Sequence, residues 1–434
     1  MGFFSGDNHV VVPPRKKRTS TKPVFEYLPK TIAIPLKSMG SEKFDIFVEV
    51  GDYVKIGTKL AVRADHFIVP VFSSVSGVVT AIENRDHVSL KKTPHIVIEN
   101  DFTDTMEEIP PWPVATRSEV CQTIRDLGIV GLGGAGFPAY IKYSNAQNVH
   151  TILLNGVECE PYISVDELYM KKSPQLLLEG LLLFMKAADA KKGIIAIKTG
   201  KPELYGILSD CLHSHFPTCN IEIYQVPNIY PIGWERALIK QVLELEYDRL
   251  PSEVGVIVNN TTSAINLAQS VKTNLPMYER YVTLSGEGFA NPQNIKVRVG
   301  TILGEVVNEI GGYTNDVPEN FRLVAGGPFM GGSIVTDDVA ITAASNSFLC
   351  LPNYEIDPMP CLRCGKCIGR CPSGLQPVQI TRETKLKNVE QLKKLAVLNC
   401  ISCGTCTYVC PSFINVTESM NKAKRFYNTE INRV

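Results

Sequence analysis

Eight cysteines near the carboxyl end form two copies of one spacing pattern, and this repeat constrains the fold more than any other feature. In each copy, three cysteines are separated by two residues each, and a fourth follows after three more residues and precedes a proline. The runs are Cys361, Cys364, Cys367, Cys371 and then Cys400, Cys403, Cys406, Cys410. This spacing is typical of proteins that hold two [4Fe–4S] clusters, in which the fourth cysteine of each run binds the other cluster.

The pattern predicts which thiolates bind each cluster. Three thiolates in one tight loop bind three corners of an iron–sulfur cube, so the fourth ligand has to come from elsewhere. We expect cluster one to be bound by Cys361, Cys364, Cys367 and Cys410, and cluster two by Cys400, Cys403, Cys406 and Cys371. Zinc is the alternative, but zinc sites usually pair two short Cys-x2-Cys hairpins without the further cysteines. Disulfides fit the spacing less well still.

Composition narrows the possible functions. Lys and Arg total 44, as do Asp and Glu, so no net charge attracts nucleic acid. The five cysteines outside the runs are scattered and odd in number, which favours a reducing cytoplasm. The most apolar stretch, 176–185, contains Glu179 and is shorter than the roughly 20 residues of a membrane span, so we expect a core helix. Any membrane association should therefore come through partners.

The amino-terminal part is predicted to be a tail followed by a small β unit. Residues 1–29 carry a basic run at 15–18, which we expect to be solvated and which lacks the apolar stretch of a secretory signal. Residues 30–100 contain short β-rich runs separated by Gly and Asp turns. The segments 50–60 and 76–79 resemble biotinyl and lipoyl carrier domains, yet no lysine occurs from Ala61 to Leu90. We therefore expect a barrel-sandwich docking module rather than a swinging arm.

The rest of the chain predicts a multidomain α/β protein. Across 115–275, strands alternate with helices, which indicates a largely parallel sheet covered on both faces. Strands are expected at 151–154, 194–197, 221–226 and 254–258, and helices at 119–127 with Ser118 as N-cap, 174–189, 202–214 and 234–247. Residues 276–332 read strand, strand, helix, strand, which suits a β-grasp unit, and a looser stretch leads to the helical two-cluster domain at 355–420.

Polar and glycine-rich segments lie at the predicted strand ends. A run of glycines at 131–136 exposes backbone N–H groups to which a phosphate could come close, although it matches neither the dinucleotide nor the P-loop fingerprint. The segment 155–161 begins where one strand ends, and Asn259-Asn260 begin where another ends. Because ligands of open α/β sheets bind outside the carboxyl ends of strands, these segments should converge on one crevice.

These segments carry a resemblance to known families. The segment 131–144, including Phe137-Pro138, Lys142 and Ser144, resembles the flavin- and NADH-binding loop of the respiratory complex I flavoprotein subunit (51 kDa). Residues 155–161, Gly233-Trp234-Glu235 and Asn259-Asn260-x2-Ser263 are similar to three further motifs of that subunit. With the carrier-like unit, a β-grasp (SLBB-like) unit and the cluster loops in this order, the chain resembles the RnfC family of the Rnf complex, an ion-translocating ferredoxin:NAD+ oxidoreductase. The resemblance extends over most of 30–420.

The resemblance implies a set of cofactor-binding residues. For FMN these are Gly131, Gly133, Gly134, Gly136, Lys142 at the phosphate, Asn155, Glu158, Asn259, Asn260 and Ser263. For NADH they are Phe137, which stacks on the adenine, and Glu160 and Glu235 at the ribose. Val157, Cys159 and Trp234 depart from complex I, so the flavin environment should differ. Local alternatives are a first-turn acid at Glu235, a strand-end turn at Asn259-Asn260 and a buried, inert Cys159.

The resemblance also implies a function. Electrons from reduced ferredoxin pass through partner subunits and both [4Fe–4S] clusters to FMN and reduce NAD+, while membrane subunits translocate ions. The chain would be a peripheral subunit on the cytoplasmic side of the cell membrane, with integral membrane subunits and a ferredoxin-like subunit as partners and no nucleic acid. Hydride transfer needs no acid, base or nucleophile, so we name no catalytic residue. The alternatives are a soluble NADH-dependent cobalamin reductase-like flavoprotein and a non-catalytic iron–sulfur electron wire.

Overall fold

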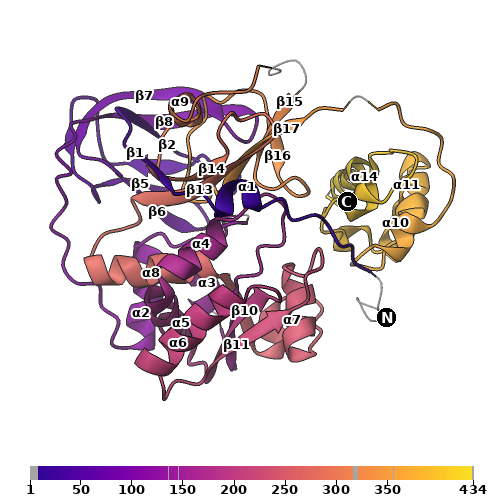
Figure 1. Cartoon of the computed structure of the whole chain (residues 1–434), viewed down its shortest axis with the longest axis horizontal. Coiled ribbons are helices and arrows are strands. Elements are labelled where there is room, and N and C mark those ends of the chain that lie inside the picture. The colour runs from indigo at the N-terminus through magenta and orange to yellow at the C-terminus, as the bar shows by residue number, and fades with distance from the viewer. Residues whose placement is uncertain (1–7, 135, 145, 316–320, 355, 433–434) are drawn as a thin grey trace.

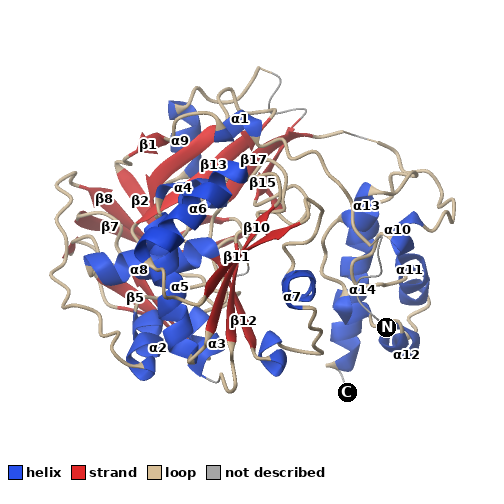
Figure 2. Cartoon of the chain, turned by 60° about the horizontal axis from the view of Figure 1, so that its bottom comes forward, coloured by secondary structure: helices blue, strands red, loops and turns tan. Residues whose placement is uncertain are grey.

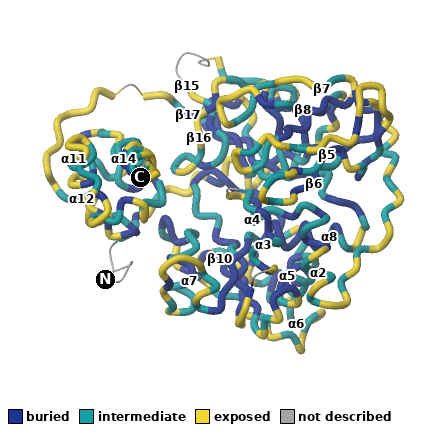
Figure 3. The backbone as a smooth tube through the Cα atoms, turned by 180° about the vertical axis from the view of Figure 1, so that it is seen from behind, coloured by how far each residue is buried: buried dark blue, intermediate teal, exposed yellow. Residues whose placement is uncertain are grey.

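A computed structural model describes residues 8–134, 136–144, 146–315, 321–354 and 356–432. Their elements form a body built on four sheets and a separate helical unit at the carboxyl end, joined by an extended segment (Figure 1). The described residues of that segment are mostly exposed, whereas buried residues concentrate in the body (Figure 3). Among the described helices, none combines the length and apolar character needed to cross a membrane.

The unit predicted at 30–100 is a sandwich of two small antiparallel sheets. One sheet has the strand order β2-β8-β7-β4 and the other β3-β5-β6. The strands are β2 (Thr31–Pro35), β3 (Phe44–Ile46), β4 (Tyr53–Val54), β5 (Lys59–Ala64), β6 (Ile68–Phe72), β7 (Gly77–His87) and β8 (Lys91–Asn100). Ile32, Ile34 and Ile96 alternate along their strands and fill the space between the sheets. Gly77 is required where β7 approaches β8, since a Cβ there would lie 1.9 Å from the Glu99 carbonyl oxygen.

The N-terminal segment packs on the body, and the expectation of a solvated basic run is wrong for Lys16, although the other three basic residues of 15–18 are exposed. Val10 exchanges two backbone hydrogen bonds with Tyr230, of 3.0 and 2.8 Å. Helix α1 (Lys17–Ser20) follows, and strand β1 (Phe25–Tyr27) pairs in parallel with a strand of another unit. Lys16 and Thr19 are buried. The sequence could not reveal this because the partners of these side chains lie more than a hundred residues away.

The central α/β domain rests on a parallel sheet, as predicted, with the strand order β11-β10-β9-β12. Its strands are β9 (Thr151–Asn155), β10 (Lys192–Lys198), β11 (Ile221–Val226) and β12 (Val256–Asn260). Its helices are α2 (Arg117–Asp126), α3 (Ala139–Ser144), α4 (Val165–Lys172), α5 (Pro174–Ala188), α6 (Pro202–His215), α7 (Glu235–Leu243) and α8 (Thr261–Thr273), with the 3-10 turn η1 (Pro251–Val254). Helices α2, α5, α6 and α8 cover one face of the sheet and α7 covers the other (Figure 2).

Two of the predicted helix ends differ from the structure. Helix α2 is capped by Thr116 rather than Ser118, because Thr116 and Glu119 exchange side-chain-to-backbone hydrogen bonds in a capping box. Helix α7 ends at Leu243, since Glu244 adopts a left-handed conformation with φ 59°. The apolar spacing continues to Leu245, which packs on the same core from outside the helix.

The β-grasp unit is larger than predicted. Its strands are β13 (Glu279–Gly286), β14 (Gln293–Arg298), β15 (Phe321–Ala325), β16 (Gly332–Ile334) and β17 (Ser347–Pro352), with helix α9 (Leu303–Glu309). The sheet order is β1-β14-β13-β17-β15-β16, so β17 lies in the middle of the sheet, where the sequence predicts a looser stretch. Strand β17 is short and buried along most of its length, so it lacks the alternation that marks a half-buried strand.

The carboxyl-terminal unit is helical, as predicted. Its elements are α10 (Lys366–Gly369), α11 (Pro377–Lys385), α12 (Val389–Lys394), η2 (Val397–Asn399), α13 (Thr405–Tyr408) and α14 (Val416–Ile431). Ile380, Leu392 and Met420 form its apolar core. Because this core is small, we expect the groups that the cysteines bind to contribute much of the stability of the unit.

The contact between α5 and α8 yields a test of this packing. A Cβ at Gly180 would lie 2.0 Å from the Ala264 carbonyl oxygen, so Gly180→Ala should force the helices apart and lower the free energy of unfolding by about 1–3 kcal/mol. Gly206→Ala in α6 is the matched control, because a Cβ there meets nothing within 4 Å. It should raise the free energy of unfolding by about 0.5–1 kcal/mol. Urea titration measures both, and a Gly180→Ala protein as stable as wild type would contradict the packing.

Candidate functional site

The predicted strand-end segments lie side by side at the carboxyl edge of the parallel sheet. Asn155 and Asn260 end β9 and β12 and are paired in register. The Asn155 side chain donates to the Gly233 carbonyl oxygen at 2.8 Å and accepts from the Val157 N–H at 3.1 Å. Asn155 therefore connects the loop after β9 to the loop before α7. This arrangement builds one edge at which a ligand could contact several loops.

The glycine loop is fixed to the start of α8. The Ser263 hydroxyl donates to the Val130 carbonyl oxygen at 3.0 Å and accepts from the Leu132 N–H at 3.1 Å. Gly131 closes the loop by donating to the Phe137 carbonyl oxygen at 2.8 Å. Gly133, with φ 74°, and Gly134 are exposed, while Ala135 lies outside the described residues.

Asn259 and Asn260 make local hydrogen bonds whose partners the sequence does not predict. Asn260 is the N-cap of α8, where its side chain accepts from the Thr262 N–H at 2.7 Å. It also donates to Asp166 at 3.1 Å. Asn259 is buried and donates to the Tyr143 hydroxyl. These two asparagines therefore shape the edge of the sheet, and any ligand contact would come in addition to that role.

Lys142 is partly buried at the same edge. From α3, its ammonium donates to the Val258 carbonyl oxygen at 2.6 Å. Burial lowers the pKa of Lys142, and the carboxylate of Glu235 acts in the opposite direction. An anion at this edge would offset the cost of burying the ammonium. Lys142 is therefore placed to stabilise a phosphate close to the strand ends.

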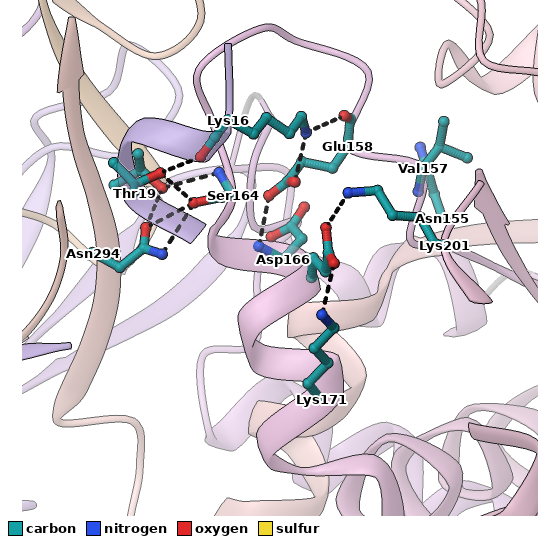
Figure 4. A network of polar contacts seen from close by, with 12 residues as sticks. Lys16, Thr19, Asn155, Val157, Glu158, Ser164, Asp166, Lys171, Lys201 and Asn294 are labelled. Atoms are coloured by element: carbon teal, nitrogen blue, oxygen red, sulfur yellow. Dashed lines mark hydrogen bonds and ion pairs between the residues drawn. The ribbon is translucent and has the colours of Figure 1, made fainter. Parts of the chain in front are cut away.

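Glu158 forms a buried ion pair with the N-terminal segment. Its carboxylate lies 2.6 Å from the Lys16 ammonium, which also donates to the Glu158 carbonyl oxygen at 2.8 Å (Figure 4). The second carboxylate oxygen accepts from the Asp166 N–H at 2.8 Å. Burial raises the pKa of Glu158 to about 7, although Lys16 lowers it. The predicted flavin contact thus also fastens the segment that the sequence predicts to be a tail.

Glu160 connects the loop after β9 to the β-grasp unit and to Tyr230 of its own domain. Its carboxylate accepts from the Phe329 and Met330 N–H groups, both at 3.1 Å, and lies 3.3 Å from the Tyr230 hydroxyl. Gly327 leaves room for it, since a Cβ there would lie 2.3 Å from a carboxylate oxygen. Burial raises the pKa of Glu160 to about 7, and these hydrogen bonds oppose the rise.

The three residues predicted to hold NADH lie in three different environments. The Phe137 ring packs edge-on against Phe67 of the barrel-sandwich unit, with ring centroids 5.7 Å apart. Glu235 accepts from the Tyr247 hydroxyl at 2.9 Å, and Glu160 makes the contacts described above. The sequence motifs are adjacent to one sheet edge, but these side chains do not meet in one hydrogen-bonded group.

The cysteines separate into two sets, each mixing the two runs. One cavity is lined by Cys371 together with Cys400, Cys403 and Cys406. Burial raises the pKa of Cys367, and nearby Cys361, Cys364 and Cys410 raise it further. The first set thus surrounds a space, and among the described residues no three His, Cys, Asp or Glu side chains lie close enough together to hold a single ion. Three cysteines from one run and the fourth from the other therefore fit the crossed ligation of two four-iron clusters.

The contact between the body and the cysteine unit contains Cys159 and three aromatic residues, Tyr230, Phe329 and Tyr408, that sequence reasoning missed. Burial raises the pKa of Cys159 to about 11, which is the environment of an inert buried thiol. The Tyr230 hydroxyl donates to the Cys403 carbonyl oxygen at 2.8 Å. Phe329 packs between Tyr230 and Tyr408, with centroid separations of 4.5 and 5.4 Å. No sequence motif marks these aromatic residues, because only the folded chain brings them together.

Comparison with protein families matches four parts of the chain. The matches are the RnfC barrel sandwich hybrid domain at 6–103, the Nuo51 FMN-binding domain at 124–269, the SLBB domain at 281–336 and a 4Fe-4S dicluster domain at 353–411. The α/β domain is thus an FMN-binding domain of the Nuo51 type, and the cysteine unit is a 4Fe-4S dicluster domain.

Comparison with individual proteins gives matches along most of the chain. The RnfC protein of the Na(+)-translocating ferredoxin:NAD(+) oxidoreductase complex of Acetobacterium woodii is 33% identical over 391 residues, which cover 87% of this chain and 86% of the relative. The corresponding protein of the proton-translocating ferredoxin:NAD(+) oxidoreductase complex of Clostridium ljungdahlii is 31% identical, with 84% and 81% covered. The corresponding protein of the ion-translocating oxidoreductase complex of Vibrio cholerae is 32% identical, with 88% and 50% covered.

One of the similar solved structures is an NAD+-reducing [NiFe]-hydrogenase in the H2-reduced state. It is 17% identical, with 74% of this chain and 62% of that chain covered and a TM-score of 0.47. A similarity at this level carries no inference about the site.

The environment of Glu160 predicts a pH dependence. A carboxyl group whose pKa rises from 4.5 to about 7 on folding stabilises the protein when protonated, so stability falls as the pH rises through this window. The full displacement corresponds to roughly 3 kcal/mol. Glu160→Gln should therefore reduce the loss of unfolding free energy between about pH 5 and about pH 8. Part of the loss should remain in this variant, because the pKa of Glu158 is also raised to about 7.

Urea titration at several pH values measures the slope of the unfolding free energy against pH. The control is Glu108→Gln, which changes an exposed glutamate in the linker and should leave the slope as in wild type. An unchanged slope in Glu160→Gln would show that Glu160 is not protonated in this window.

Proposed function

This chain belongs to the RnfC family, whose members are subunits of Rnf-type ion-translocating ferredoxin:NAD(+) oxidoreductase complexes, and from this membership we propose that it passes electrons between ferredoxin-linked partner subunits and NAD(H). In this proposal it is a peripheral subunit at the cytoplasmic face of the membrane. Integral membrane subunits translocate the ion, and a ferredoxin-like subunit delivers or accepts electrons.

The observation that carries the proposal is the contact of the cluster-two loop with the FMN-binding domain. Tyr230 contacts the Cys403 carbonyl oxygen and the Glu160 carboxylate, at 2.8 and 3.3 Å. A Cβ at Gly404 would lie 2.9 Å from the Phe329 ring, so the loop also packs closely on the SLBB unit. The loop that carries three ligands of cluster two is therefore next to the loop that leaves β9. Transfer of single electrons requires such proximity.

The residues of the chain act by binding and positioning. When bound, FMN exchanges a hydride with NAD(H) and single electrons with a [4Fe–4S] cluster. Gly133 and Gly134 present an exposed backbone for the flavin phosphate, and Lys142 supplies a cation beneath it. Asn155 and Asn260 hold the neighbouring strand ends in place. The hydrophobic contacts around Tyr230 and Phe329 keep the cluster domain in position and exclude water from the contact.

We propose the crossed cysteine sets as the cluster ligands, and paired substitutions test them. In the double variant C371S/C403S both lost thiols belong to cluster two, so about four of the eight expected iron atoms should remain. In C364S/C371S, the lost thiols lie in one run but in different sets, so both clusters should be lost. Iron and acid-labile sulfide per chain, with EPR of the reduced protein, measure this. The opposite result would mean that each run binds its own cluster.

The proposed order of electron transfer gives a second prediction. Cluster two lies next to the FMN-binding domain, so in C371S/C403S NADH should still reduce the flavin but should no longer reduce cluster one. In C361S/C410S, which removes two ligands of cluster one, NADH should still reduce cluster two. After anaerobic mixing with NADH, visible absorption and EPR distinguish reduction of the flavin from reduction of each cluster. Purified protein that contains iron but no FMN, and that NADH does not reduce, would indicate an electron wire instead.

A further inference from the structure

A second cavity lies beside the loop after β9, and we call it the basic pocket. It encloses about 590 Å³ and is lined by parts of the N-terminal segment at 14–21, the loop at 156–158 and the β10–α6 connection at 198–201. In Figure 4, Lys16 reaches Glu158, and Lys201 lies near Val157 with its ammonium paired to Glu167. Cavities of several hundred Å³ are the usual size for small-molecule ligands.

Cations outnumber acids in the basic pocket. Six cationic and two acidic side chains line it: Arg15, Lys16, Lys17, Arg18, Lys198 and Lys201 against Glu158 and Glu167. Both acids are already paired. Glu158 binds Lys16, and Glu167 binds Lys201 and Lys171. Arg15 and Arg18 pair with Glu287. The pocket thus retains uncompensated positive charge.

Lys198 is the most distinctive of these cations. It ends β10, is only 8% exposed and lines the basic pocket. Within the described part of the chain, its ammonium makes no hydrogen bond or ion pair. Burial and, to a smaller extent, the positive charge of Lys16 together lower the pKa of Lys198 to about 8. A buried ammonium without a partner is costly, and a bound anion would offset that cost.

The start of helix α6 opens into the same space. Its N-cap, Lys201, makes no side-chain capping bond, and Pro202 at the first position has no N–H, so the N–H groups of Glu203 and Leu204 are the ones that lack a side-chain acceptor. Gly200, with φ 79°, has no atoms within 4 Å of where a Cβ would lie. A helix start with free N–H groups and a positive dipole end favours a phosphate or carboxylate.

We propose that the basic pocket binds the phosphate groups of a nucleotide, with Lys198 and the start of α6 as its anion partners. The inference rests on the proposed function to the extent that NAD(H) is the nucleotide in question, since the flavin phosphate is assigned to the glycine loop and Lys142. The residues predicted for NADH, namely Phe137, Glu160 and Glu235, make separate contacts inside the protein. The basic pocket instead gathers several cations beside the 156–158 loop, which follows the β9 end of the flavin-binding edge.

Anaerobically purified holoprotein should bind inorganic pyrophosphate in calorimetric titration. Lys198→Gln should weaken this binding at least about tenfold, as expected for the loss of one charge-assisted contact. The matched control is Lys192→Gln, which removes a lysine at the opposite end of the same strand and should bind pyrophosphate as wild type does. Lys198→Arg should retain most of the affinity because it keeps the charge.

Titration with NADH tests whether NADH is the source of the phosphate. If the pocket takes NADH, pyrophosphate should compete with it, and Lys198→Gln should raise the KM for NADH about tenfold at unchanged kcat and FMN content. Loss of flavin from the same variant at unchanged KM for NADH would contradict the inference, because the flavin phosphate is assigned to Gly133, Gly134 and Lys142, which do not line this pocket.

Two results of the pyrophosphate titration would contradict the proposed phosphate site. Failure of wild type to bind pyrophosphate, or equal binding by the Gln variants at positions 198 and 192, would sink the inference and leave the proposed function standing, provided that NADH still reduces the flavin and clusters. Wild type that lacks FMN and does not react with NADH would sink the proposed function, while pyrophosphate binding would still report on the pocket.

Discussion

Two carboxylates on one short loop, Glu158 and Glu160, hold the units of this chain in fixed positions relative to one another. Glu158 binds Lys16 of the N-terminal segment, whereas Glu160 binds the backbone of Phe329 and Met330 in the SLBB unit. Both carboxylates are largely withdrawn from water, which is costly unless each finds its partners. Because the partners come from different units, the cost is offset only when those units are docked. The loop after β9 therefore couples the folding of the FMN-binding domain to the placement of its neighbours.

This coupling bears directly on electron transfer. Tyr230 lies between Glu160 and the cluster-two loop, and Phe329 packs on the same side, so the carboxylate that orders the SLBB loop also orders the contact with Cys403. The cluster domain also contacts the N-terminal segment, where Arg370 donates to the His9 carbonyl oxygen at 3.4 Å, and an exposed segment joins it covalently to the body. Without the contact with Cys403 the distance between flavin and cluster would vary. A one-electron pathway thus depends on hydrogen bonds that contain no redox group.

The sequence predicted the features that depend on local spacing. The cysteine runs, the alternation of strands and helices, and the order of the units all follow from periodicity and short motifs. The burial of Lys16, the place of β17 in the middle of its sheet and the partners of Glu160 do not, because each depends on residues distant in the chain. The sequence does not distinguish a charged side chain that water solvates from one that binds a buried partner. Such partners become visible only in the folded structure.

The same distinction explains why several predicted flavin residues make internal hydrogen bonds. Ser263 fixes Val130 and Leu132, and so holds Gly133 in its left-handed conformation without occupying the exposed face of the loop. Asn260 likewise caps α8 at the strand end. A loop already held in its binding shape loses little conformational entropy when a ligand arrives, so such residues raise affinity without touching the ligand. The motif shared with the complex I flavoprotein therefore combines residues that shape the crevice with glycines that face it, and a side chain with internal partners remains part of the site.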